Sequence, residues 1–241
     1  MKIKEKVIKE IKLIPEGIVF TYEDISKNPE EKEAVIKNLN RLVSSGELSK
    51  LSKGRFYRAK ITPFGKLQPN EFETSKDLLE KKGKQIGYLT GFAVYNKLKL
   101  TTQIGKIIQI GRRDPKPSLQ RGNYIIRFVK QNNEITKQNI PILQILDSIR
   151  YIKEIPDSTP SFLCNRFKAI LSNLSPKDKE ILVKLALNYS PATKALTGAL
   201  LDEIGYSKIS EKLLQSLNPI SSYKLGISQE VLSNTTKWNI K

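Results

Sequence analysis

The first sixty residues carry a fixed order of helical and extended patterns, and this order constrains the fold more than any other feature of the chain. Apolar residues recur at helical spacing from Ile3 to Ile14, with lysines between them, and this amphipathic pattern ends near Gly17. The short apolar run 18–20 can pair as a strand. Thr21 then stands where a second helix begins, because its hydroxyl is suited to cap free backbone N–H groups.

A third helix and a hairpin complete the pattern. The helix is predicted over residues 30–45, with one apolar and one polar stripe, and it ends at Gly46. Two extended segments follow, 48–51 and 55–58, and the turn between them has Gly54 where a positive φ is most needed. Three helices, a short strand and a hairpin in this order predict a winged helix-turn-helix, a DNA-binding module in which the hairpin is the wing.

The exposed stripe of the predicted third helix and the predicted wing carry the side chains that a DNA reader uses. Lys and Arg suit guanine edges or phosphates, and Asn suits an adenine edge or a sugar-phosphate contact. For any single residue, an ordinary solvated surface charge is the alternative. The candidate DNA-binding residues are Lys37, Asn40, Arg41 and Ser44 on the helix and Lys50, Lys53 and Arg55 on the wing.

Three acids stand at the start of the same helix. Glu30, Glu31 and Glu33 suit the positive N-terminal end of a helix, but they would repel phosphates if that end pointed into a groove. DNA contacts are therefore expected from the middle of the helix and from the wing.

The net charge of +18 is unevenly distributed along the chain. Residues 61–153 hold 17 Lys and Arg against 7 Asp and Glu, which makes the middle the most basic part. Such a charge favours polyanions and predicts salt-dependent binding to nucleic acid, either DNA or RNA. A lysine-rich composition explains some of the net charge. The basic side chains cluster at Lys81, Lys82, Lys84, Arg112, Arg113, Lys116 and Arg121.

The turn residues from Thr62 to Asn70 predict a linker, so the main domain boundary is expected after residue 60. Residues 61–153 should form a mixed α/β part, with a helix over 71–82, another from Thr90 and two strands, and residues 154–241 a helical part. The fold class is thus α+β, mostly helical: an N-terminal winged helix-turn-helix (1–60) and a larger α/β domain (61–241) ending in a helical bundle. The strands are expected at 105–110 and 123–129, and helices at 142–151, 161–171, 175–189, 190–204 and 209–217.

The residue inventory argues against an enzyme. The chain has one cysteine, Cys164, and no histidine, which excludes an internal disulfide, a cysteine-cluster metal site and a Ser-His-Asp triad. Neighbouring acids such as Asp77 with Glu80 could hold Mg²⁺ in a nuclease, but such pairs are usually surface acids. No catalytic residue, metal or cofactor is predicted. No apolar stretch approaches a membrane span, and the expected compartment is the cytoplasm.

Residues 87–103, which read GYLTGFAVYNKLKLTTQ, resemble the AbiEi family of bacterial antitoxins when they follow a winged helix. Further segments resemble the same relatives: VFTY at 19–22 and LNRLV at 39–43, then ALTGALL at 195–201, LNPI at 217–220 and YKLG at 223–226. The order of these segments is the stronger argument, because none of them is a specific motif alone. The resemblance covers almost the whole chain, with weak points in the linker and at 132–158.

This resemblance implies the antitoxin of a type IV toxin-antitoxin system. The winged helix would repress the shared operon at its promoter DNA, and the C-terminal domain would counter a nucleotidyltransferase-like toxin without a stable complex. Two alternatives are a transcription regulator with an unrelated ligand-sensing or nucleic-acid-processing domain, and a nucleic-acid enzyme that uses the winged helix for docking. Antitoxin-domain candidates are Tyr88, Thr90, Asn96, Gln103, Arg112 and Arg113.

For the antitoxin-domain candidates, purely structural roles are equally open. The segment Gly87–Gly91 could pack the start of a helix, with Thr90 as its cap and Gly91 needed for close approach. Gly198, inside a helical pattern, indicates tight helix packing, and Cys164 is expected to be a buried structural thiol.

Overall fold

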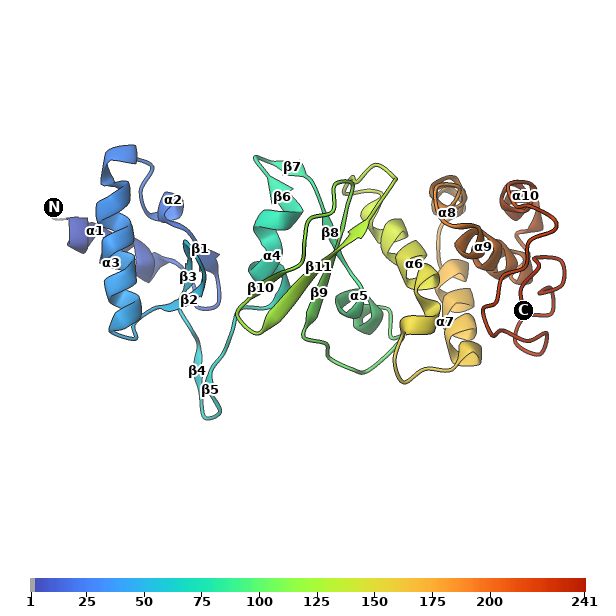
Figure 1. Ribbon diagram of the computed structural model, residues 1–241, viewed down its shortest axis with the longest axis horizontal. Coiled ribbons are helices and arrows are strands. Elements are labelled where there is room, and N and C mark those ends of the chain that lie inside the picture. Colours follow the sequence, from blue (N-terminus) through green and yellow to red (C-terminus); the bar gives the residue numbers. More distant parts are fainter. Residues whose placement is uncertain (1–2) are drawn as a thin grey trace. The chain divides into compact units, whose positions relative to one another are not determined.

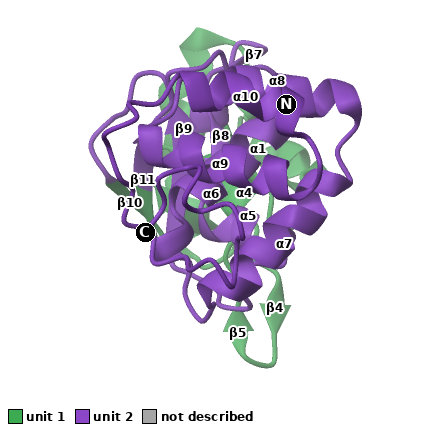
Figure 2. Cartoon of the chain, turned by 90° about the vertical axis from the view of Figure 1, so that its right-hand side faces the viewer, with its two compact units in different colours: residues 1–77, 119–126 green, residues 78–118, 127–241 purple. Residues whose placement is uncertain are grey.

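The computed structural model describes residues 3–241 (Figure 1). Helix makes up 44% and strand 16% of the structure, which confirms the predicted α+β, mostly helical class. Contacts divide the chain into two compact units (Figure 2), each with its own core. Unit 1 comprises Met1–Asp77 and Leu119–Ile126, and unit 2 comprises Leu78–Ser118 and Arg127–Lys241.

Unit 1 begins with the elements expected from the sequence. Strands β1, β3 and β2 form an antiparallel sheet in that order, and α1 and α3 pack on each other through Val7, Val35 and Leu39, all fully buried. The elements are α1 (Ile3–Leu13), β1 (Val19–Phe20), α2 (Tyr22–Ile25), the 3₁₀ turn η1 (Pro29–Glu31), α3 (Lys32–Ser44), β2 (Ser49–Ser52) and β3 (Arg55–Tyr57).

Local signals explain these boundaries. The backbone N–H and hydroxyl of Thr21 both donate to the Asp24 carboxylate, at 2.7 and 3.0 Å, and so fix the start of α2. Asn28 accepts a hydrogen bond from the Glu30 N–H at 3.1 Å and starts η1. Gly54 has a φ of 73°, as the tight turn between β2 and β3 requires.

The predicted linker is not a bare loop. Residues 61–66 form a small hairpin, β4 (Ile61–Thr62) with β5 (Gly65–Lys66), and α4 (Glu71–Leu79) follows. The Glu73 carboxylate accepts the backbone N–H of Val19 in β1 at 2.8 Å. The predicted boundary after residue 60 therefore lies inside unit 1, because α4 is hydrogen-bonded to the N-terminal sheet.

Unit 2 combines short strands with a helical bundle. The four-stranded sheet has the order β10-β11-β9-β8, and the division between the units falls inside β11, after Ile126. Four of the short strands, β6, β7, β8 and β10, are absent from the sequence-based expectation, and β6 begins where the helix expected over 71–82 ends early at Leu79. The elements of unit 2 are β6 (Glu80–Lys81), β7 (Lys84–Gln85), β8 (Tyr88–Thr90), α5 (Phe92–Lys97), β9 (Ile107–Arg112) and the second part of β11 (Tyr124–Lys130), whereas β10 (Leu119–Arg121) belongs to unit 1.

The second half of unit 2 is helical, as expected. Ser175 and Ser190 accept backbone N–H groups of Asp178 and Thr193 and start α8 and α9, each before a first-turn proline. Cys164 is fully buried, and burial raises the pKa of its thiol to about 11, which fits a structural role. The elements are α6 (Ile140–Arg150), the 3₁₀ turn η2 (Ile152–Glu154), α7 (Pro160–Ser172), α8 (Pro176–Ala186), α9 (Pro191–Glu203) and α10 (Ser207–Gln215).

The C-terminal tail closes the core of unit 2 against α9. A Cβ placed on Gly198 would lie 2.1 Å from the ring of Trp238, a fully buried side chain, so only glycine lets this ring lie on the helix. The indole N–H donates to Asp202 at 3.2 Å, and Tyr223 pairs with Ile240 as an isolated bridge. The expectation of tight packing at Gly198 is confirmed, and the contacting group is an aromatic ring of the tail.

Candidate nucleic-acid interface and a buried polar network

The polar stripe of α3 is exposed as expected, but its four candidate side chains differ in availability. The Asn40 amide donates to the Ile36 carbonyl at 3.0 Å, and the Ser44 hydroxyl donates to the Asn40 carbonyl at 3.1 Å. Within residues 3–241, the side chains of Lys37 and Arg41 have no hydrogen bond, ion pair or ring contact, and both residues are exposed. The two cations of this stripe are therefore free to contact a ligand.

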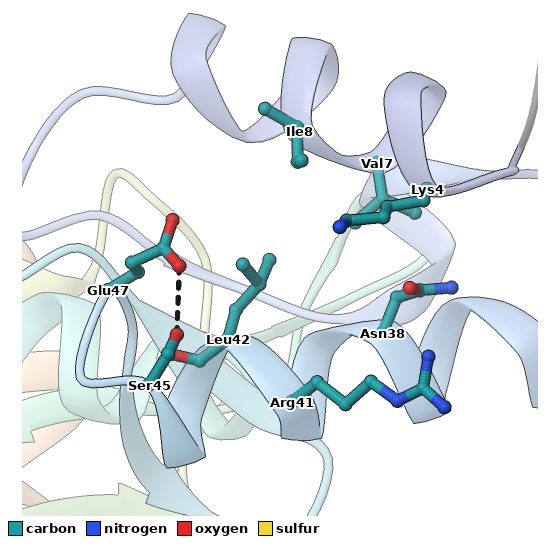
Figure 3. Close-up of a pocket in the computed structure, with 8 residues that line it drawn as sticks. All are labelled: Lys4, Val7, Ile8, Asn38, Arg41, Leu42, Ser45 and Glu47. Carbon is teal, nitrogen blue, oxygen red and sulfur yellow. Dashed lines mark hydrogen bonds between the residues drawn. The ribbon is translucent and has the colours of Figure 1, made fainter.

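Arg41 also borders a small cavity of about 210 Å³ between α1 and α3 (Figure 3). Val7, Ile8 and Leu42 supply its apolar surface. In the figure, the Arg41 side chain extends along α3, and Asn38 lies between it and α1. Arg41 thus lies at one edge of the exposed stripe. The complete lining is Lys4, Val7, Ile8, Asn38, Arg41, Leu42, Ser45 and Glu47.

One of the acids at the start of the predicted third helix, Glu31, is held by contacts within unit 1. The Glu31 carboxylate accepts from the Lys6 ammonium at 2.6 Å and from the Ser26 hydroxyl at 2.5 Å. The hydrogen bond from Lys6, followed by that from Ser26, lowers the pKa of Glu31. This side chain ties η1 to α1.

The three wing candidates fall into two groups. Lys50 and Lys53 are exposed and, among the described residues, make no ionic contact. Arg55 forms an ion pair with Asp77 of α4, with 2.5 Å between Nη2 and Oδ2. Two cations of the β2–β3 hairpin are therefore free to contact a ligand, whereas Arg55 holds this hairpin against α4.

Asp77 joins three distant segments of unit 1. Its two carboxylate oxygens also accept from the guanidinium of Arg121 in β10, at 2.5 and 2.9 Å, and Arg121 is nearly buried. Burial alone would raise the pKa of Asp77, but the hydrogen bonds and charges of Arg121 and Arg55 outweigh burial and lower it. Arg121, which the sequence analysis counted in the basic cluster of the middle region, is a structural ion-pair partner.

The antitoxin-domain candidates do not form one exposed cluster. Tyr88 and Thr90 are buried, and Gly91, with a φ of 70°, stands at the N-cap of α5 in place of the predicted Thr90. The Asn96 amide donates to the Gln103 carbonyl at 2.7 Å, which ties α5 to the following loop. The Gln103 amide in turn donates to Asp157.

The two arginine candidates lie elsewhere in unit 2. The Arg112 guanidinium lies 5.9 Å from the centre of the Phe128 ring, and Arg113 is exposed. Both line a cavity of about 270 Å³ together with Lys84 of β7 and Glu134. This part of the basic region can meet an anion, whereas Arg121 is already paired within unit 1.

Tyr88 belongs to a buried polar network that the sequence analysis missed. Its hydroxyl donates to Asp147 of α6 at 2.7 Å, and the Tyr189 hydroxyl donates to the other oxygen of Asp147 at 2.8 Å. The Gln131 amide donates to both tyrosine hydroxyls at 2.8 Å, and its carbonyl accepts from Asn133. An aspartate among the inward-facing isoleucines and leucines of α6 is the sequence signal that could have found it.

The charge of Asp147 is costly in this position. The residue is 1% exposed, and burial raises the pKa of its carboxyl, although the hydrogen bonds from the two tyrosines act in the opposite direction. Burial likewise raises the pKa values of Tyr88 and Tyr189, so both hydroxyls stay protonated and can donate. Buried networks of this kind fix one arrangement of the core when every member is satisfied.

A polar cavity of about 330 Å³ opens beside this network in unit 2. Its lining combines two cations, Lys130 and Arg150, with amide and hydroxyl groups. Gln131 and Tyr189 belong both to the lining and to the buried network. The complete lining is Lys130, Gln131, Asn132, Arg150, Asn188, Tyr189 and Ser190.

Among residues 3–241, no group of three or more His, Cys, Asp or Glu side chains is arranged to hold a metal ion. Over the same residues, none of the helices has the length and apolar character needed to cross a membrane.

Comparisons with known proteins place the chain in a family but assign no activity. A protein family described as "Family of unknown function (DUF6088)" matches residues 6–158. The structure is similar to the crystal structure of the Rv2827c protein from Mycobacterium tuberculosis, with a TM-score of 0.60 and 14% identity over 92% of this chain and 84% of that one. At this identity the likeness concerns the fold alone. No curated protein matches the sequence.

Asp77→Asn tests the ion-pair cluster of unit 1. The substitution leaves the nearly buried Arg121 without a counter-ion, so we expect the free energy of unfolding to fall by about 1–3 kcal/mol in urea titrations. The loss should be near the lower end of this range if water around the half-exposed position 77 solvates the guanidinium of Arg121. Exposed Glu80→Gln is the control and should change stability by less than about 0.5 kcal/mol. An Asp77→Asn protein as stable as the parent would contradict the structural role.

Asp147→Asn tests the cost of the buried charge. The unfolded chain releases this proton near pH 4, and the folded protein releases it at a higher pH because burial raises the pKa. Between these two values the unfolded state binds fewer protons, so the stability of the parent relative to Asp147→Asn should fall as pH rises from about 4. Unfolding titrations at pH 4–8 measure this difference. A relative stability that rises with pH would contradict the account.

Proposed function

The chain belongs to the DUF6088 family, whose description gives no activity, and we propose from its own residues that it binds duplex DNA through unit 1. In this proposal the three helices and the β2–β3 hairpin act as a winged helix-turn-helix. α3 enters the major groove, and the hairpin contacts the neighbouring backbone. The protein represses its own operon by binding the promoter.

The observation that carries the proposal is the separation of free from paired cations in unit 1. Lys37 and Arg41 on α3 and Lys50 and Lys53 on the hairpin are exposed, and each lacks an internal partner among the described residues. Arg55 and Arg121 are held by Asp77. Free Lys and Arg side chains on a helix and the adjacent hairpin match the needs of phosphate and guanine recognition.

The antitoxin role rests on the resemblance to the AbiEi family. We propose that the C-terminal domain counters a nucleotidyltransferase-like toxin, that it does so without a stable complex and without catalysis, and that the protein works in the cytoplasm, where its promoter is. In the same proposal, the exposed Arg113 and the neighbouring Arg112 give this domain a basic surface that can meet RNA.

One observation favours the alternative of a ligand-sensing regulator. The 330 Å³ cavity beside the Asp147 network has the size of a small-ligand site and polar groups on all sides. A ligand there would contact Gln131 and Tyr189, and both of these residues are hydrogen-bonded to the buried network around Asp147 in unit 2. Loss of promoter binding on addition of a small metabolite would favour this alternative.

The double substitution Lys37→Gln with Arg41→Gln tests DNA binding by α3. We expect the affinity for the chain's own upstream duplex to fall by about 10–100-fold. The slope of log affinity against log salt should decrease by about one for each phosphate that the variant no longer neutralises. Fluorescence anisotropy at several salt concentrations measures both. The matched control is Lys9→Gln with Lys12→Gln, which removes the same charge from exposed positions of α1.

The control separates local contact from total charge. If both double variants lose affinity equally, only the net charge matters and α3 is not the reading element. If neither loses affinity, the proposed interface is wrong.

The same α3 variant separates the two proposed roles. Co-expressed at full length with the neighbouring nucleotidyltransferase-like protein, it should lose promoter repression, measured with a reporter, and still restore cell growth. Loss of growth rescue together with repression would show that the roles are not divided between the two parts of the chain.

A further inference from the structure

The β4–β5 hairpin of unit 1 exposes a concentration of large apolar side chains. Phe64 at its tip is fully exposed, and Ile61 and Leu67 on its arms are 76% and 49% exposed. Isolated apolar side chains on a surface are normal, but three within seven residues at the end of a hairpin form a patch that indicates an interaction site.

The tip of the hairpin is held in one conformation. The Thr62 hydroxyl donates to the Gly65 carbonyl at 2.9 Å and accepts from the Phe64 N–H at 3.3 Å. Gly65 has a φ of 108°, a conformation that side-chain-bearing residues rarely adopt, and the Leu67 N–H donates to the Lys60 carbonyl at 2.9 Å. These bonds fix the backbone that carries Phe64 at the tip.

A single contact places the hairpin beside the end of α3. The Lys66 ammonium donates to the Gly46 carbonyl at 3.0 Å, at the turn that follows the helix. A cation at this end of a helix also complements the helix dipole. In Figure 1 the hairpin extends from this point away from the sheet of unit 1.

The charge around the apolar tip favours DNA over a protein surface. Residues 60–67 contain Lys60 and Lys66 and no acid, in a chain with a net charge of +18. A second copy would bring like charges together, whereas phosphates would neutralise them. One arm, from Lys60 to Pro63, spans roughly 10 Å, which exceeds the depth of about 7.5 Å of the minor groove.

We propose that the β4–β5 hairpin is a DNA wedge: when α3 lies in the major groove, the hairpin crosses the phosphate backbone and inserts Phe64 between base pairs from the adjacent minor groove. Apolar side chains used in this way unstack a base step and bend the duplex. Lys60, whose side chain has no partner among the described residues, contacts a phosphate, and the Lys66 ammonium, which keeps its bond to the Gly46 carbonyl, adds positive charge beside the backbone. This inference rests on the proposed DNA binding and adds to it a bent, locally unstacked operator.

The test uses the full-length chain and the duplex upstream of its gene. Footprinting first locates the bound segment of this duplex, and 2-aminopurine is then placed at successive positions within that segment. This base brightens when it is unstacked. We expect the parent protein to raise the fluorescence at one or two adjacent steps beside the α3 contact. Phe64→Ala should abolish this signal and weaken binding by about 5–100-fold.

Phe72→Ala is the matched control. Phe72 lies on α4 of the same unit and is 55% exposed, so its replacement removes an exposed ring outside the hairpin. It should leave both fluorescence and affinity unchanged. Both phenylalanines are exposed, so thermal unfolding of each variant should match that of the parent.

Each outcome decides one proposal. If the parent does not bind the duplex, the proposed function fails. If it binds, but no position brightens and Phe64→Ala binds as tightly as the parent, the wedge is wrong and DNA binding by unit 1 stands. If sedimentation shows that Phe64→Ala converts an oligomer into a monomer, the hairpin binds a second copy and the wedge is likewise overturned.

Discussion

The carboxylate of Asp77 is the point on which unit 1 depends. It accepts from Arg55 at the start of β3 and from both terminal nitrogens of Arg121 in β10. Asp77 thus joins a hairpin near the N-terminus to Arg121, which lies 44 residues after Asp77 in the sequence. Four residues before it on α4, Glu73 accepts the Val19 N–H of β1. The N-terminal sheet is therefore fixed to α4, and the proposed wing has a rigid base.

This arrangement decides which cations are available. Formal charge alone makes Arg55 and Arg121 as suitable for DNA as Lys37 or Lys53, but the pairing with Asp77 removes them from that set. A functional surface in so basic a chain is defined by cations that lack an internal partner. Unit 2 shows the converse case: Asp147 has no ion-pair partner among the described residues, and the hydroxyls of Tyr88 and Tyr189 hold its buried carboxylate instead.

Local physics explains which parts of the fold could be predicted. The stripes of α3, the glycine turn at Gly54 and the serine caps of α8 and α9 depend on residues within one or two turns of each other, and all were predicted. The short strands β8 and β10 exist because of partners elsewhere in the sheet, and their own patterns are too short to reveal them. The linker prediction failed because Thr62 and Gly65 build a hairpin from residues that are equally common in loops.

Side-chain partners were beyond sequence reasoning for the same reason. Tyr88 was selected as a candidate, but its partner Asp147 lies 59 residues away, and Gln131 links to it only through the folded core. Asn96 and Gln103, selected with it, prove to secure the loop after α5. Sequence patterns thus located residues that matter without indicating whether they bind a ligand or hold the fold.

The structure of the full chain bound to its own promoter duplex tests the central claim most directly. The account predicts α3 in the major groove, with the Lys37 and Arg41 side chains within hydrogen-bonding distance of phosphates or base edges and the β2–β3 turn against the neighbouring backbone. A complex in which α3 faces solvent, and the duplex lies instead on the basic side chains of unit 2, would contradict it.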